Sequence, residues 1–143
     1  LFRSGTGTAY YVISVLRNTS VIGTINFATK QDFNVDGQPS FIALADVDGD
    51  GVNDIITGNV GTNNISVLLN YSTAGSLVMS LLKNFTTGAN SADLAVADYD
   101  GDGKQDILLG GNFYQSKPEV GIYDAGYGLL LKGDGKGNFI AVV

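Results

Sequence analysis

The chain has 143 residues, a net charge of -6, and neither cysteine nor histidine. Its hydrophobic fraction of 44% and charged fraction of 15% exclude a disordered chain, no apolar run reaches the length of a membrane span, and eight scattered Lys and Arg residues disfavour nucleic acid and anionic membranes as partners. Without cysteine there is no disulfide framework or zinc-thiolate site, and without histidine the usual proton shuttle at neutral pH is missing.

The apolar residues come in short runs rich in Ile, Val, Leu and Tyr, which is the pattern of strands, and no segment keeps a helical period. Turn residues such as GTNN, STAGS and GDGKGN separate these runs. The predicted strands, in chain order, lie near residues 10–16, 24–30, 41–45, 54–58, 65–69, 77–82, 93–97, 106–109, 127–131 and 139–143. The sequence therefore predicts an all-β fold.

A repeat of 52 residues organises the chain. Residues 13–58 align without a gap on residues 65–110, with 18 identities in 46 pairs, and the matches run through apolar segments as well as polar loops. Repeats of this length are typical of propellers, solenoids and arrays, in which one unit cannot bury its own hydrophobic face.

Each full repeat contains four predicted strands, so the chain holds about two and a half four-stranded antiparallel units of the propeller-blade type. We divide the single repeat domain, 1–143, into a half unit with its connector (1–36), a first repeat (37–88) and a second repeat (89–143). Residues 110–126 are an insertion relative to the first repeat, and we expect them to form a surface excursion.

Two loops at the same phase of the repeat crowd aspartates together. Residues 46–54 are DVDGDGVND and residues 98–106 are DYDGDGKQD, and these loops hold eight of the fourteen acidic residues. Carboxylates this close repel one another and raise each other's pKa unless a positive charge lies among them. The simplest explanation is a bound cation in each loop.

Calcium fits this pattern because it takes six to eight oxygen ligands from loops that alternate carboxylates with glycines. In the first loop, the predicted ligands are the carboxylates of Asp46, Asp48, Asp50 and Asp54 and the backbone carbonyl of Val52. In the second loop, they are the carboxylates of Asp98, Asp100, Asp102 and Asp106 and the carbonyl of Lys104. Magnesium is disfavoured because it keeps its water and seldom uses an all-protein cage.

Neither loop is an EF-hand. The twelfth position, where an EF-hand has a bidentate Glu, holds Thr57 or Leu109, so we infer that Asp54 and Asp106 take the bidentate role. An ordinary DG-rich hairpin turn is the simpler alternative for one loop, but two loops with the same spacing favour metal binding. A weaker third candidate site comprises Asp32, Asn34 and Asp36, for which a structural turn is the favoured interpretation.

The loops and their flanking strands, ALADVDGDGVNDIITGN and AVADYDGDGKQDILLGGN, resemble the FG-GAP and VCBS-type repeats of integrin-like β-propellers. The resemblance implies a calcium ion in each loop, between the first two strands of a blade, and an extracellular role in adhesion, recognition or scaffolding. A closed propeller usually needs at least four blades, so we do not expect this chain to close a ring by itself.

Three functions are considered. The leading hypothesis is a calcium-stabilised, secreted or cell-surface structural module, not an enzyme, that assembles with copies of itself into an oligomer or filament. The second is a piece of a larger integrin-like propeller that binds a protein or glycan, to which a surface formed by Tyr10, Tyr11, Tyr114, Tyr123 and Tyr127 would contribute. The third is an enzyme that uses aspartates for acid/base work or to hold a catalytic metal.

Overall fold

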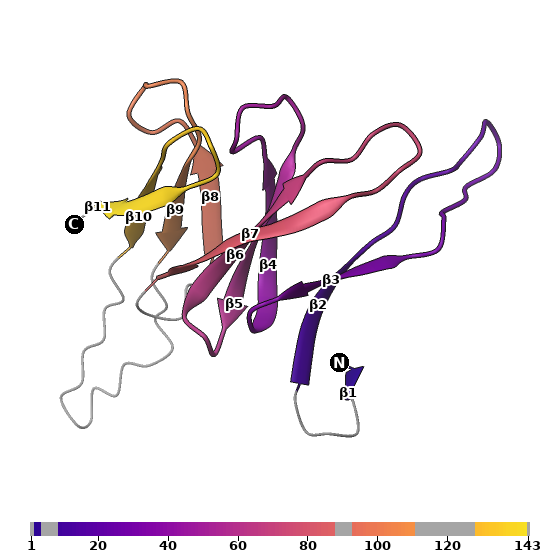
Figure 1. Ribbon diagram of the computed structural model, residues 1–143, viewed down its shortest axis with the longest axis horizontal. Helices are drawn as coiled ribbons and strands as arrows, with labels where there is room; N and C mark the ends of the chain where they lie inside the picture. The colour runs from indigo at the N-terminus through magenta and orange to yellow at the C-terminus, as the bar shows by residue number, and fades with distance from the viewer. Residues whose placement is uncertain (1, 4–8, 88–92, 111–127, 143) are drawn as a thin grey trace.

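The computed structural model describes residues 2–3, 9–87, 93–110 and 128–142, and it is all-β in these ranges (Figure 1). The middle sheet, called blade 1, is a meander of four antiparallel strands: β4 (Gln38–Ala45), β5 (Asp54–Val60), β6 (Asn64–Asn70) and β7 (Met79–Thr86). No helix occurs in the described part of the chain, so none there could cross a membrane.

Two further sheets flank blade 1. Blade 2 is a second four-stranded meander of β8 (Asp93–Ala97), β9 (Asp106–Gly110), β10 (Leu129–Gly133) and β11 (Phe139–Val142). The N-terminal sheet contains β1 (Phe2–Arg3), β2 (Ala9–Val15) and β3 (Gln31–Val35). The three sheets lie side by side as partial propeller blades and do not close (Figure 1).

The predicted all-β class is confirmed, whereas the strand predicted at 24–30 is wrong. Strand β2 pairs instead with residues 31–35, through Ile13 opposite Phe33. The prediction failed because Ile25 and Phe27 suggested a buried strand face, but both side chains are exposed. The predicted insertion at 110–126 lies almost entirely outside the described residues.

Residues 16–30, the first arm, form a long hairpin extension with only isolated bridges between its sides, and residues 71–78, the second arm, repeat its design (Figure 1). The bridge between Val21 and Thr24 recurs 52 positions later between Thr73 and Ser76. Each turn has a glycine in the left-handed region, with φ of 83° at Gly23 and 87° at Gly75. The half unit therefore corresponds to the last two strands of blade 1.

Two apolar clusters join the sheets. One packs between blades 1 and 2 and includes Ile56, Ile65 and Val67 from blade 1 with Ile107 and Leu131 from blade 2. The other packs between the N-terminal sheet and blade 1, and its buried members are Ile13, Val35, Ile55 and Leu68. Because β5 and β6 are buried on both faces, blade 1 depends on its two neighbours for a core.

A glycine in the middle of β5 makes room for an aromatic ring on β4. Gly58 pairs with Phe41, and a β-carbon added at Gly58 would lie 1.8 Å from Phe41 Cζ. The equivalent pair in blade 2 is Gly110 with Asp93, where an added β-carbon would meet nothing closer than the Asp93 carbonyl oxygen at 3.8 Å. The same glycine is thus sterically required in only one blade.

We predict that Gly58→Ala lowers the free energy of unfolding by about 1–3 kcal/mol, because the new methyl group forces the Phe41 ring out of its position. Chemical denaturation monitored by circular dichroism measures the change. The matched control is Gly110→Ala, which we expect to be neutral or slightly stabilising. Equal losses in the two variants would contradict the explanation.

Candidate metal centres

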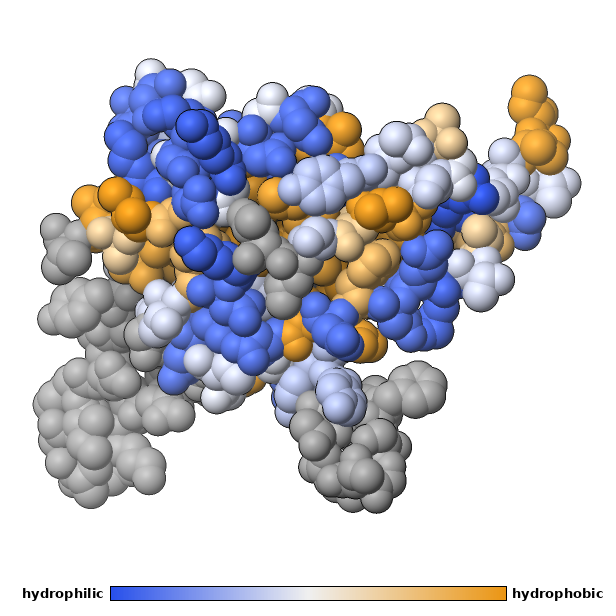
Figure 2. Space-filling model, in the orientation of Figure 1, coloured by the Kyte–Doolittle hydropathy of each residue, from blue (hydrophilic) through white to orange (hydrophobic). Residues whose placement is uncertain are grey.

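The two aspartate loops occupy the same place in their blades. Residues 46–53, called loop 1, join β4 to β5, and residues 98–105, called loop 2, join β8 to β9. Both loops lie at the same end of the sheets, at the top of the view in Figure 1, where the surface in Figure 2 is largely hydrophilic. The chain thus presents two carboxylate-rich turns along one edge.

The first aspartate of each loop holds the turn together. In loop 1, Asp46 accepts hydrogen bonds from the backbone N–H groups of Gly49 at 2.7 Å, Asp50 at 3.2 Å and Gly51 at 2.8 Å. In loop 2, Asp98 accepts the same three bonds, and the donors are Gly101 at 2.7 Å, Asp102 at 3.1 Å and Gly103 at 2.9 Å. The two turns therefore share one backbone design.

Glycines allow this tight curvature. Gly49 and Gly51 have φ of 81° and 87°, and Gly101 and Gly103 have φ of 79° and 83°. Side chains other than glycine rarely adopt this left-handed conformation, so the glycine spacing is required by the backbone itself. The glycines that alternate with the aspartates are thus required because the backbone turns tightly at these positions.

The carboxylates converge in each loop, although not in the complete sets that we predicted. Carboxylate oxygens of Asp46, Asp48 and Asp50 lie within 4.8 Å of one another in loop 1, and those of Asp98, Asp100 and Asp106 do so in loop 2. Converging carboxylates on a curled loop are the ligands that calcium uses, so the two clusters fit a calcium ion.

Val52 and Lys104 stand at the seventh position of their loops. Their backbone N–H groups donate to Asp50 at 2.7 Å and to Asp102 at 3.0 Å. The role of their carbonyl groups as ligands stays a prediction.

Asp54 forms a buried clamp that the sequence did not reveal. Its side chain is fully buried, and its two carboxylate oxygens accept the N–H groups of Val47 at 2.9 Å and Asn70 at 2.8 Å. It therefore ties loop 1 to the end of β6. Burial raises the pKa of the Asp54 carboxyl, and the two backbone hydrogen bonds oppose that rise.

Asp106 makes the equivalent clamp in blade 2. It accepts the N–H groups of Tyr99 at 3.0 Å and Gly133 at 2.9 Å, and so ties loop 2 to the end of β10. A carboxylate has about four lone-pair sites, so two backbone bonds leave capacity for a metal ion. The bidentate ligation that we inferred for Asp54 and Asp106 stays a prediction, to which the structure adds a direct structural role.

Two lysines accompany loop 2, and the sequence analysis missed one of them. Lys132 on β10 pairs with Asp100 and, at 3.4 Å, with Asp102, which also pairs with Lys104 at 3.1 Å. The hydrogen bond from Lys104 lowers the pKa of Asp102, and the Asp100 carboxylate raises the pKa of the Lys132 ammonium. The only sequence signal for Lys132 is its position just before a strand end, which has meaning only once the strand register is known.

The weaker third candidate lies mostly in a strand, and the chain bends at Asp36 and Gly37, as the favoured turn interpretation expects only for that part. Asp32 and Asn34 lie within β3, where Asp32 accepts a hydrogen bond from Ser14 Oγ at 2.6 Å and pairs with Lys30. Asp36 follows the strand and accepts a hydrogen bond from the Asn64 amide at 2.6 Å. Within the described residues, these carboxylates do not gather into a cluster like those of the two loops.

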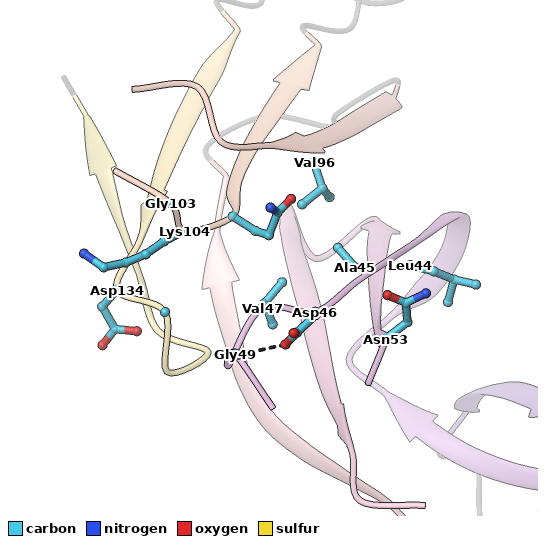
Figure 3. A pocket seen from close by; sticks show the side chains of 12 residues that line it. Leu44, Ala45, Asp46, Val47, Gly49, Asn53, Val96, Gly103, Lys104 and Asp134 are labelled. Carbon is cyan, nitrogen blue, oxygen red and sulfur yellow. Dashed lines mark hydrogen bonds between the residues drawn. The ribbon is translucent and has the colours of Figure 1, made fainter. Parts of the chain in front are cut away.

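An open pocket of about 580 Å³ separates loop 1 from blade 2 (Figure 3). It is lined by Asp46 and Asn53 on one side and by Lys104 and Asp134 on the other. The turn between β10 and β11 closes one end, because the N–H of Gly137 donates to the Val47 carbonyl at 3.0 Å. Loop 1 thus contacts the neighbouring blade directly.

Meandering four-stranded sheets with a duplicated acidic loop define a protein built of propeller-blade repeats. The FG-GAP-like repeat model matches residues 46–109, and the FG-GAP repeat model matches residues 91–131. Residues 46–131 therefore match FG-GAP-type repeats, which indicate an integrin-like propeller module. Neither curated proteins nor solved structures gave a significant match.

We predict that Asp54→Ala lowers the free energy of unfolding by about 2–5 kcal/mol even in excess EDTA, because one buried and one part-buried N–H group lose their acceptor. Thermal and chemical denaturation measure the loss. Asp48→Ala, which removes an aspartate of the same loop outside the clamp, is the control and should have a much smaller effect in EDTA. A loss for Asp54→Ala that disappears in EDTA would mean that this residue acts only as a metal ligand.

Proposed function

We propose that this chain is a calcium-stabilised structural module that acts outside the cell, has no catalytic activity, and assembles with copies of itself. The observation that carries the proposal is the duplicated loop, in which three carboxylates converge around a glycine-rich turn in each blade. The chain offers no histidine or cysteine for catalysis. A duplicated site, one to each blade, suits a stabilising ion better than a single reaction centre.

Calcium would relieve the main electrostatic cost of the loops. Each loop, together with the first residue of the strand after it, holds four aspartates in nine residues, and two calcium ions would change the formal charge from -6 to -2. Calcium sites in extracellular modules have affinities of about 10⁻⁴–10⁻³ M, which suit the millimolar calcium outside cells. This match between site and environment supports an extracellular location.

The outer face of blade 2 supports assembly. Leu108 occupies the place of Ile56 in the repeat and is 40% exposed, whereas Ile56 is fully buried beneath blade 2. On the adjacent edge strand β11, Ile140 and Val142 are 69% and 49% exposed. Blade 1 buries this apolar face against blade 2, whereas the same face of blade 2 is exposed. Another blade would cover it.

The first arm offers a second exposed apolar surface. Val21, Ile22 and Ile25 are 70%, 106% and 84% exposed, and hydrophobic surface is visible at the end of this arm in Figure 2. The first arm already lies close to the second arm, since a β-carbon added to Gly75 would lie 3.9 Å from the Arg17 side chain. Contacts between arms would extend a row of blades.

A part of a larger integrin-like propeller that binds a protein or glycan is the second candidate. The same open face of blade 2 favours it, since a following blade of the same chain would cover that face equally well. The tyrosine surface gives it less support, because Tyr11 packs against the N-terminal apolar cluster while Tyr10 is exposed, and Tyr114, Tyr123 and Tyr127 lie outside the described residues.

We predict that the chain binds two calcium ions and that EDTA lowers its melting temperature. At calcium about twenty times above Kd, each site adds about 2 kcal/mol of stability. Isothermal titration calorimetry of the metal-stripped chain and scanning calorimetry with and without EDTA measure both quantities. Magnesium at the same concentration is the control and should restore little stability. The proposal fails if calcium produces no binding heat and EDTA leaves the melting temperature unchanged.

We predict that the calcium-loaded chain elutes as an oligomer in size-exclusion chromatography with light scattering, and that Ile140→Lys shifts it toward monomer by placing a charge on the open face. The control is Ile22→Lys, which makes the same charge change at the tip of arm 1 and should weaken assembly less. A monomer at every concentration tested would contradict self-assembly and favour the larger propeller.

A further inference from the structure

We propose that the two loops are unequal calcium sites, because the ammonium group of Lys132, on the neighbouring strand β10, competes with an ion for the carboxylates of loop 2. This inference rests on the proposed function. Loop 1 would be the tighter calcium site, and loop 2 would be the weaker site, partly neutralised by the chain itself before any ion binds.

The strand registers locate the difference. Ile55 pairs with Leu68 in blade 1, and Ile107 pairs with Leu131 in blade 2. Because Ile107 is the repeat equivalent of Ile55, the residue after Leu131, Lys132, takes the place of Leu69. Leu69 is buried against blade 2 at 3% exposure, whereas the Lys132 side chain is 39% exposed.

The loops differ at a second position. Lys104 in loop 2 replaces Val52 in loop 1. Two lysines, Lys104 and Lys132, therefore lie beside the carboxylates of loop 2, whereas the equivalent positions beside loop 1 hold Val52 and Leu69. Among the described ion pairs, Lys132 contacts Asp100 and Asp102, and Lys104 contacts Asp102. None of these pairs involves a carboxylate of loop 1.

The carboxylate clusters follow this difference. Asp50 belongs to the cluster of loop 1, but its equivalent, Asp102, is missing from the cluster of loop 2. Asp102 is instead the residue that both lysines contact, at 3.1 Å from Lys104 and 3.4 Å from Lys132. Asp100 remains in the cluster of loop 2 while it pairs with Lys132, so an ion and the ammonium would share one carboxylate.

Coulombic repulsion gives the consequence. A divalent ion beside Asp100 and a lysine ammonium on the same carboxylate repel each other, so calcium binding must displace Lys132 or tolerate its charge. Conversely, without calcium the lysine offsets part of the repulsion within loop 2, and none of the ion pairs in the described ranges does the same for loop 1. Loop 2 should therefore stay folded at calcium concentrations too low for calcium to bind it.

The test measures each loop separately by calorimetric titration with calcium chloride. Asp48→Asn impairs loop 1, and Asp100→Asn, its repeat equivalent, impairs loop 2, so each variant reports mainly on the other loop. We expect tighter calcium binding in Asp100→Asn than in Asp48→Asn. Adding Lys132→Met to Asp48→Asn should tighten loop 2 about two- to fivefold, the range expected for loss of an exposed ion pair.

Lys30→Met in the Asp48→Asn background is the matched control, since it makes the same charge change at a lysine that pairs with Asp32, outside both loops. It should leave the calcium affinity of loop 2 unchanged. In EDTA, Lys132→Met should also melt at a lower temperature than the unaltered chain, because loop 2 loses its internal cation.

Two outcomes distinguish failure of this inference from failure of the proposed function. Calcium uptake at two sites of equal affinity, unmoved by Lys132→Met, would overturn the inequality and leave the proposed function intact. No calcium uptake by the unaltered chain would overturn both.

Discussion

A buried carboxylate at the start of the second strand of each blade is the interaction on which the rest of the structure depends. Asp54 and Asp106 each accept one backbone N–H from the preceding loop and one from the end of the third strand. A side chain without two acceptor oxygens would leave at least one of these donors unpaired, so one residue links the loop, the second strand and the third strand. The geometry of the outer carboxylates follows, because it is the clamped loop that brings them together.

The apolar packing has a similar dependence on neighbours. Blade 1 buries both of its faces, one against the N-terminal sheet and one against blade 2, whereas blade 2 keeps one face open. In repeat architectures each unit is stabilised by the interfaces with its neighbours rather than by a core of its own. The proposed ion binding at the loop edge would therefore add to the stability that the array gains from burial between the sheets.

The sequence predicted the parts of this protein that depend on local spacing. The apolar runs on either side placed both loops between the first two strands of a blade, and the Asp-Gly alternation within the loops matches the left-handed backbone at Gly49, Gly51, Gly101 and Gly103. The repeat also identified the half unit as the latter part of a blade. The strand predicted at 24–30 failed because alternation of Ile25 and Phe27 does not show whether a neighbouring strand exists to pair with them.

Features that depend on contacts between distant residues could not be predicted. The clamp made by Asp54 requires knowledge that Asn70 lies beside it, and sixteen positions of sequence separate the two. Lys132 gained meaning only from the pairing of β9 with β10, which aligns it with Leu69. Charge counting alone assigns the acidity of both loops to metal binding and does not distinguish one loop from the other.

The hydrogen bond from Gly137 to Val47 gives the loop edge a mechanical role. It fastens the last hairpin of blade 2 to loop 1 of blade 1, at the loop end of the apolar cluster between the sheets, to which the Val47 side chain belongs. A twist of one sheet against the other would strain this hydrogen bond together with the packing of Val47. Ordering of loop 1 would accordingly limit the movement of blade 1 relative to blade 2. A row of blades joined in this way would resist bending and torsion.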